Sequence, residues 1–161
     1  MPDQQDSVEL GSLLKSTTVG ELTLKVRTKL DPTDTIASAS ALMRNRSHGS
    51  ALVCDGEKLV GIFTERDLLN AIASGTDMST AISKVMTPNP HTVTEKASLY
   101  DAVQLMDTGG YRRVPVVNAD GEALGIVDTK SVVHLLVEYY PAAVYNQASH
   151  DQIIAKHAEG A

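Results

Sequence analysis

The residues best suited to binding chemistry are Thr64 and Asp67, which stand three positions apart after the run Gly61-Ile62-Phe63. A carboxylate can accept hydrogen bonds from both vicinal hydroxyls of a ribose. A threonine hydroxyl beside the backbone amides of a helix N-terminus can hold a phosphate. The same spacing also suits a helix cap, with the threonine at the N-cap and the aspartate in the first turn. The residues therefore leave two interpretations open, a nucleotide contact and a cap.

A second copy of this stretch lacks the pair. Residues 123–133 repeat the pattern of 59–69, but Asp128 stands in place of Thr64, and Ser131 in place of Asp67. Asp128 is an equally good N-cap residue. Its charge would repel a phosphate, however, and a serine cannot replace a carboxylate that holds a ribose. If capping were the only role, both versions would serve; if a ligand binds, only the first is competent.

Two adjacent arginines, Arg112 and Arg113, form the densest positive charge away from the chain ends. Arginine forks suit phosphate oxygens, although a solvated loop would also explain the pair. Adjacent side chains of an extended loop point to opposite sides, which predicts that only one of the two reaches a ligand. None of the five histidines has the spacing of metal ligands. Phosphate-loop, nucleophile-elbow and zinc-protease motifs are also missing, so we expect neither a metal site nor an enzyme.

These residues lie in a chain that repeats itself at an offset of about 63 residues. Residues 34–43 match 97–106, and the apolar runs at 51–54 and 59–63 match those at 114–117 and 124–127. Apolar residues at helical spacing predict helices over 36–43 and 99–106, the second capped by Ser98 and Asp101. Turns that contain Asp-Gly join the β-rich runs and predict hairpins. A further helix is expected after each hairpin, over 67–73 and 131–140.

Each unit is therefore predicted to run strand–helix–strand–strand–helix, an α/β (α+β) fold. A unit of about 60 residues with almost no aromatic side chains would be marginally stable alone. We expect the two units to pack through their sheets around a shared core. The predicted domains cover residues 17–75 and 76–140, the latter including the linker. Residues 1–16 are expected to form a loose polar extension, and residues 141–161 an unrepeated C-terminal extension.

The composition argues against several classes of protein. A net charge of −6 over 161 residues disfavours nucleic-acid binding, which depends on many Lys and Arg side chains. No apolar run approaches the roughly 20 residues of a membrane span, and the polar first ten residues do not look like a signal peptide. The single cysteine, Cys54, lies in an apolar run, which favours a buried structural thiol. We expect a cytoplasmic protein without nucleic-acid or membrane partners.

Taken together, these features resemble a tandem pair of CBS domains, named after cystathionine β-synthase. The resemblance covers roughly residues 17–140 and rests on "VMTPNPHTV", on "RRVPVVN" with the following "LGIV", and above all on "GIFTERDLL". It implies a disc-shaped module that forms homodimers and binds AMP, ADP, ATP or S-adenosylmethionine as a regulatory ligand, with no cofactor required.

The resemblance also implies where the ligand lies. In this family the Gly-to-Asp motif of one unit faces the first strand and central loop of the other. The nucleotide-binding residues carried over in this way are Gly61, Ile62, Thr64, Asp67, Pro90, His91, Tyr111, Arg112 and Arg113. The complementary pocket would combine Asp128 and Ser131 with His48, Gly49 and Ser50. We expect this second site to be degenerate, because it has no carboxylate in the ribose position and no arginine pair.

Two hypotheses follow for the function. The first is a stand-alone regulatory module that binds one adenine nucleotide per chain and signals to an unknown partner protein. The second is a dimerisation or scaffold module without a ligand, in which Thr64 and Asp67 only cap a helix. The arginine pair favours the first hypothesis, and the degenerate Asp128 and Ser131 favour the second.

Overall fold

The computed structural model describes residues 4–22, 24 and 28–139, with side chains from Leu10 onward. The chain divides into two compact units, one ending at Val127 and the other beginning at Asp128. The first unit holds both sheets, except for the last residue of β7, Asp128, and four of the five described α-helices. The described part of the second unit is α5 (Thr129–Tyr139), a single helix that directly follows strand β7.

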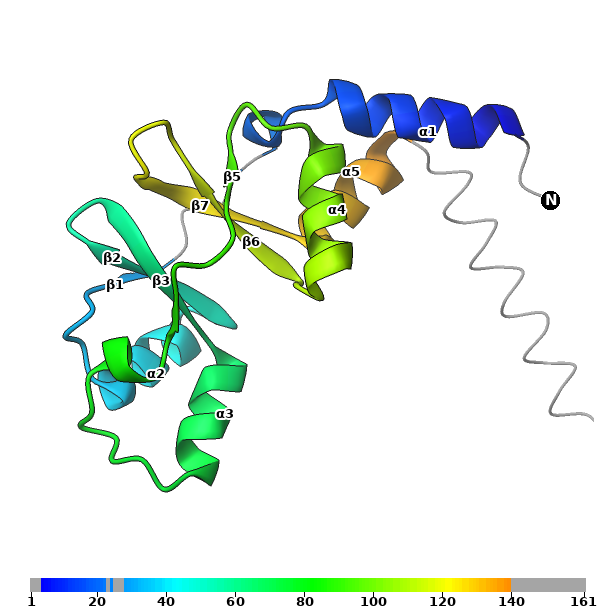
Figure 1. Ribbon diagram of the computed structural model, residues 1–161. Helices are drawn as coiled ribbons and strands as arrows, with labels where there is room; N and C mark the ends of the chain where they lie inside the picture. Colours follow the sequence, from blue (N-terminus) through cyan, green and yellow to red (C-terminus); the bar gives the residue numbers. More distant parts are fainter. Residues whose placement is uncertain (1–3, 23, 25–27, 140–161) are drawn as a thin grey trace, which may run out of the picture. The chain divides into compact units, whose positions relative to one another are not determined.

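The first sheet has four strands in the order β1-β2-β3-β4 (Figure 1). Strand β1 (Lys29–Leu30) is parallel to β2 (Ser50–Asp55), and β2 forms a hairpin with β3 (Lys58–Thr64). The hairpin register pairs Ser50 with Thr64 at one end and Asp55 with Lys58 at the turn. Gly56 occupies the turn with a φ of +62°, a conformation that glycine adopts without steric cost. The predicted hairpin is confirmed.

Strand β2 is buried on both faces, which explains its unbroken apolar run. Successive side chains of a strand point to opposite faces. Ala51 and Val53 belong to one core cluster, together with residues of α2 (Ile36–Asn45) and α3 (Glu65–Ala73). Leu52 and Cys54 belong to another cluster, together with Ala123 and Ile126 of the second repeat. The shared core that the sequence predicts is therefore present within the first unit.

The second repeat builds a three-stranded sheet in the order β5-β6-β7, from β5 (Val93–Thr94), β6 (Arg113–Val117) and β7 (Ala123–Asp128). Helix α4 (Leu99–Gly109) begins at the predicted cap: the Ser98 Oγ accepts from the Asp101 N–H at 3.1 Å and donates to its carboxylate at 2.8 Å. The helix ends at Gly110, which adopts a φ of +66°. The fold is thus a mixed α/β fold with two small sheets, as predicted.

The sequence repeat includes a short 3₁₀ helix near the start of each repeat. Residues Val19–Glu21 and Ile82–Lys84 both form such a turn. Val19 and Ile82 are both fully buried, and Ile82 joins the core of the first sheet. Ile82 lies in the linker between the two repeats, so a linker residue is part of the core of the first sheet.

The place of strand β4 (Thr87–Pro88) in the first sheet was not predicted. It belongs to the second repeat by sequence but pairs antiparallel with β3 of the first sheet, Ile62 with Thr87 and Gly61 with Pro88. A proline lacks the N–H donor that a central strand needs, but it is accepted in the edge strand. A Cβ on Gly61 would overlap the Met86 sulfur and lie 3.1 Å from the Thr87 carbonyl oxygen, so glycine allows this close pairing without a shift of Met86.

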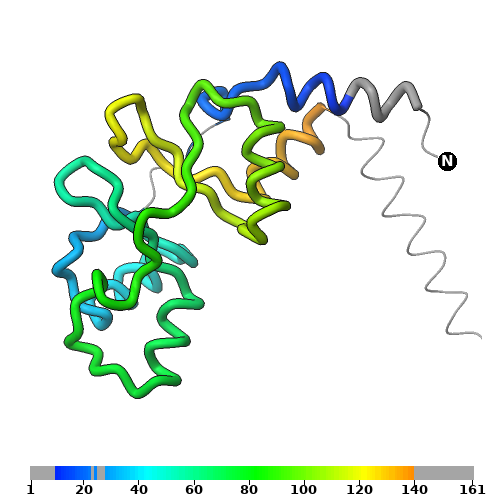
Figure 2. The backbone as a smooth tube through the Cα atoms, viewed as in Figure 1, coloured from blue at the N-terminus to red at the C-terminus, as the bar shows by residue number. Residues whose placement is uncertain are grey.

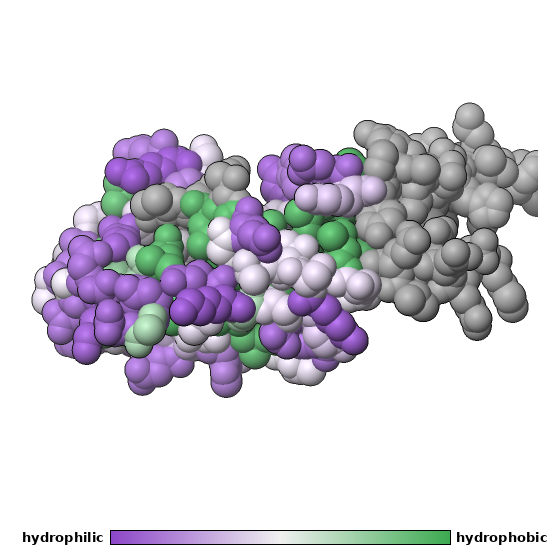
Figure 3. Space-filling view, turned by 90° about the horizontal axis from the view of Figure 1, so that it is seen from above, coloured by the Kyte–Doolittle hydropathy of each residue, from purple (hydrophilic) through white to green (hydrophobic). Residues whose placement is uncertain are grey.

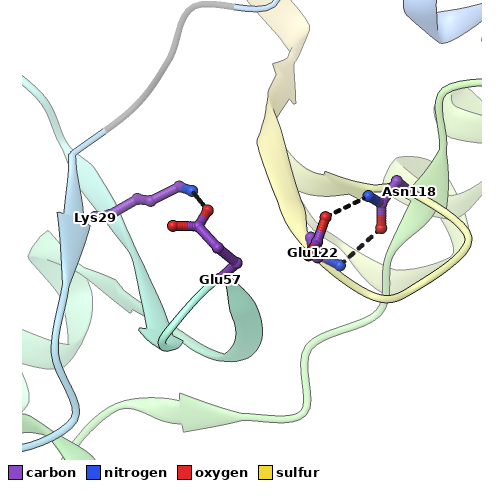
Figure 4. Close-up of polar contacts among 4 residues, drawn as sticks. All are labelled: Lys29, Glu57, Asn118 and Glu122. Atoms are coloured by element: carbon purple, nitrogen blue, oxygen red, sulfur yellow. Dashed lines mark hydrogen bonds and ion pairs between the residues drawn. The ribbon is translucent and has the colours of Figure 1, made fainter.

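The turns of the two hairpins lie side by side (Figure 2). Lys58 and Glu122 form an antiparallel bridge, and the Leu59 N–H donates to the Gly121 carbonyl at 3.1 Å. Two further contacts hold the turns (Figure 4): the Lys29 Nζ lies 2.7 Å from the Glu57 carboxylate, and the Asn118 side-chain amide donates to Glu122 at 2.7 Å. Backbone hydrogen bonds therefore join the two repeats in addition to the shared apolar cluster.

The prediction of a loose extension over residues 1–16 was wrong for the described part. Residues Gln4–Ser16 form helix α1, which contacts α4. The Lys15 ammonium lies 5.2 Å from the centre of the Tyr100 ring. Leu10, Leu13 and Leu14 are only partly exposed. Their spacing is that of one helix face, a signal outweighed in the sequence by the polar residues around them.

Cys54 is buried, as predicted, and burial raises the pKa of its thiol. Among the residues that the structure describes, no helix has the length and apolar character of a membrane span. The predicted C-terminal extension at 141–161 lies outside the described residues.

Candidate functional site

Thr64 and Asp67 form a reciprocal cap at the start of α3. The Asp67 Oδ2 accepts hydrogen bonds from the Thr64 N–H at 2.8 Å and from its hydroxyl at 2.7 Å. The Asp67 N–H donates back to the Thr64 Oγ1 at 3.3 Å. These hydrogen bonds use one carboxylate oxygen, and among the described residues none reaches Oδ1. Capping and ligand binding are therefore compatible, since the second oxygen can still accept from a ligand hydroxyl.

A cavity of about 590 Å³ opens beside this cap. Of the nine residues predicted to bind a nucleotide, eight line it: Ile62, Thr64, Asp67, Pro90, His91, Tyr111, Arg112 and Arg113. The ninth, Gly61, is not among the lining residues and instead admits β4 and Met86 close to β3. Residues that are distant in the sequence are thus brought to one site within the first unit.

One wall of the cavity is the turn that follows β4. Asn89 has a φ of +45°, and its N–H donates to the Val60 carbonyl at 3.0 Å. A residue other than glycine rarely adopts a positive φ, so the backbone of this turn has an uncommon conformation. Pro90 and His91 follow at once, and the His91 ring lies 5.8 Å from that of Tyr111 at an interplanar angle of 34°. This wall offers apolar and aromatic surfaces suited to a flat base.

The charges of the cavity come mainly from arginines. Arg66, Arg112 and Arg113 line it, along with the carboxylates of Glu65 and Asp67. Arg113 is partly buried at the start of β6, whereas Arg112 is exposed. Both arginines line the cavity; the prediction that one of the two contacts a ligand stays a prediction.

Gly49 lies between two of these charged groups. A Cβ on Gly49 would lie 2.7 Å from the Arg113 Nη2 and 2.7 Å from the Glu65 Oε2. The Gly49 carbonyl also accepts a hydrogen bond from the Glu65 N–H at 3.2 Å. The absence of a side chain at Gly49 thus lets the two charged ends approach the same point.

The second repeat keeps the cap but changes its partners. The Ser131 N–H and hydroxyl each donate to the Asp128 Oδ1 at 2.8 Å. Asp128 and Ser131 belong to the second unit, whereas His48 belongs to the first, where its Nδ1 lies 3.1 Å from the Thr28 hydroxyl. The Ser50 side chain is fully buried, and its hydroxyl has no hydrogen-bond partner among the described residues. A degenerate second site stays a prediction.

Seven lining residues were not among the nine predicted individually: Glu65, Arg66, Thr87, Pro88, Asn89, Gly110 and Pro115. Five of them lie in residues 86–91 and 109–115, the two segments of the second repeat that the resemblance places opposite Thr64 and Asp67. Glu65 and Arg66 lie between Thr64 and Asp67, and their charges are the feature of the sequence that could have predicted their place in the site. The described residues contain no group of three His, Cys, Asp or Glu side chains that could hold a metal ion.

Comparison with known proteins identifies the family. The family model of the CBS domain matches residues 19–74 and 82–138. The chain therefore belongs to the CBS domain family and contains two of these domains in tandem.

Three similar proteins illustrate the range of this family. An uncharacterized 17.7 kDa protein of Acidianus ambivalens is 34% identical over 110 residues, which cover 68% of this chain and 66% of that protein. The CBS domain-containing protein CBSCBSPB5 of Arabidopsis thaliana is 31% identical over 76% of this chain but only 22% of its own length. The chain thus spans less than two thirds of both. The crystal structure of CBSX2, a protein of Arabidopsis thaliana, in complex with AMP superimposes with a TM-score of 0.67 at 28% identity. It covers 77% of this chain and 98% of that one.

Proposed function

We propose that this protein is a regulatory module that binds an adenine nucleotide, AMP, ADP or ATP, in the cavity beside Thr64 and Asp67. The observation that carries the proposal is the meeting of three kinds of group in one cavity: a carboxylate with a free oxygen, an aromatic pair and arginines. The AMP complex of CBSX2 supports the choice of an adenine nucleotide.

Each part of the ligand has a matching wall. The ribose hydroxyls donate to the Asp67 Oδ1, since Oδ2 is occupied by the cap. The base lies against Pro90, His91 and Tyr111. The phosphate lies near the start of α3, where the Thr64 hydroxyl lies and the helix dipole favours an anion, and near the arginine pair at the start of β6.

Regulation follows if the ligand favours one arrangement of the repeats over another. The cavity is lined both by α3 of the first repeat and by the loop before β6 of the second. A ligand shifts a conformational equilibrium only by the difference between its affinities for the two states. In this proposal the module is a cytoplasmic homodimer without catalytic activity that signals to a partner protein. Its domains are residues 17–75 and 76–140, between extensions at 1–16 and 141–161.

A second candidate function is a scaffold without a ligand. The completed Thr64–Asp67 cap favours it, because the same cap, Ser98 with Asp101, starts α4 without lining the cavity. The two caps also provide a matched pair of variants that distinguishes the two functions.

The test is the thermal midpoint of unfolding with AMP, ADP, ATP and S-adenosylmethionine, for the wild type, Asp67→Ala and Asp101→Ala. A ligand at about 100 times its dissociation constant stabilises the protein by about 2.7 kcal/mol, a shift of several degrees. Each variant loses about 0.5–1 kcal/mol of cap and dipole energy. Only Asp67→Ala is expected to lose the ligand shift as well. Equal behaviour of the two variants, with no shift in the wild type, would instead establish the scaffold.

A further inference from the structure

The cavity carries a carboxylate that a simple phosphate site does not need. Glu65 is the first residue of α3 and lines the cavity beside Arg66, Arg112 and Arg113. We propose that Glu65 limits the negative charge that the site accepts, so that a monophosphate binds more tightly than a triphosphate. This inference rests on the proposed function and concerns the same site.

The position of Glu65 is set by contacts of its backbone and side chain. Its N–H donates to the Gly49 carbonyl at 3.2 Å, which holds the residue against the segment that leads into β2. Its Oε2 and the Arg113 Nη2 both lie 2.7 Å from the point where a Gly49 Cβ would be. The Glu65 carboxylate therefore lies near Arg113, one of the three arginines that line the cavity.

Glu65 and Arg113 do not form an ion pair with each other in the described part of the chain. The side chain of Glu65 is exposed and that of Arg113 is partly buried. A phosphate that approaches Arg113 thus encounters the attraction of the guanidinium and the repulsion of the carboxylate together. The other carboxylate, Asp67, is engaged by its cap and acts at the ribose.

The consequence depends on the charge of the ligand. Three arginines and two carboxylates line the cavity, which leaves a small positive excess. A monophosphate carries about two negative charges and exceeds that excess only slightly, whereas a triphosphate carries about twice as much charge and exceeds it far more. Glu65 repels each further phosphate group of the ligand, and the described residues that line the cavity provide no further lysine or arginine to attract it. If Glu65 only interacted with the dipole of α3, it would not favour the monophosphate over the triphosphate.

The test measures the dissociation constants of AMP and ATP by titration calorimetry for the wild type, Glu65→Gln and Glu65→Lys. Magnesium is removed with a chelator, because a bound cation would neutralise the triphosphate. Asp55→Asn is the matched control: it removes one negative charge at the turn of the β2–β3 hairpin, whereas Thr64 lies at the opposite end. That separation is about 17 Å along the strand, beyond the Debye length at 0.1 M salt.

The wild type is expected to bind AMP more tightly than ATP. Glu65→Gln should reduce the ratio of the two dissociation constants about fivefold to tenfold, and Glu65→Lys should reduce it further. Asp55→Asn should leave the ratio within about twofold. A ratio that stays constant in both Glu65 variants while the wild type binds AMP would overturn the inference and leave the proposed function intact. Binding of none of these nucleotides by the wild type would refute the proposed function itself.

Discussion

At the scale of single residues, the cavity depends on a turn with an unfavourable backbone conformation. Asn89 has a φ of +45° between two prolines, and its neighbours Pro90 and His91 line the cavity. Asparagine tolerates this region better than most residues do, because its short polar side chain can form local hydrogen bonds. The identity of the residue thus matters for the shape of the aromatic wall, although its side chain need not contact a ligand.

Replacing Asn89 with alanine is expected to destabilise the protein by about 1 kcal/mol, whereas glycine should be neutral or slightly stabilising. Ser47 offers a matched control, because its φ of +53° is similar and it does not line the cavity. Ser47→Ala should have a similar effect on unfolding in denaturant. Only Asn89→Ala should weaken nucleotide binding as well, and an equal effect of both variants on binding would contradict this role.

Most of the lining residues with chemical functions could be predicted because they stand close together in the sequence. The Thr64–Asp67 spacing and the adjacent arginines are visible without a structure, and they line one cavity as expected. Glu65 was missed because a charge at the start of a helix has a sufficient explanation in the helix dipole. Asn89 was missed because a positive φ cannot be deduced from a residue that also adopts ordinary conformations.

At the scale of the elements, the hairpins and the helices that follow them were predictable, and α1 was not. The hairpins combine apolar runs with Asp-Gly turns, two signals that agree. In α1 the polar residues dominate the composition, and its stability comes from the contact with α4. Helices of this length depend on tertiary packing, which a local pattern does not reveal.

The contact between α1 and α4 leads to a prediction about stability. Replacing both Leu13 and Leu14 with alanine should lower the free energy of unfolding by about 1–3 kcal/mol, because both side chains are partly buried. The substitution Ser12→Ala on an exposed position of the same helix is the control. Denaturant unfolding measures both, and an unchanged midpoint in the double variant would show that α1 does not support the fold.

At the scale of the molecule, the repeat in the sequence and the compact part of the structure have different boundaries. Ile82 and strand β4 come from the linker and the second repeat but complete the first core and the first sheet. The hairpin turns exchange backbone hydrogen bonds, and β7 contributes Ala123 and Ile126 to a cluster with β2 and β3. One domain alone therefore lacks parts of its own core.

This arrangement predicts that the two halves do not fold separately. A fragment of residues 1–75 lacks Ile82 and β4 and should show no cooperative thermal transition by circular dichroism. Mixing it with a fragment of residues 76–161 should restore a cooperative transition. A sharp transition in the first fragment alone, near the midpoint of the whole chain, would contradict the prediction.

The face drawn in Figure 3 combines hydrophilic, intermediate and hydrophobic areas over the described residues. Two large apolar side chains of α3, Leu69 and Ile72, are 65% and 57% exposed. They lie on the helix whose first turn carries Thr64 and Asp67, so a partner that covered them would contact the same element as the ligand.

The ring of Tyr111 has a practical consequence for optical spectroscopy. The chain contains no tryptophan, and Tyr111 lines the cavity with its ring beside that of His91. A tryptophan in its place would be the sole indole fluorophore of the protein. Its emission would report directly on the polarity of the cavity and on the arrival of a stacked base, without a label and without interference from elsewhere in the chain.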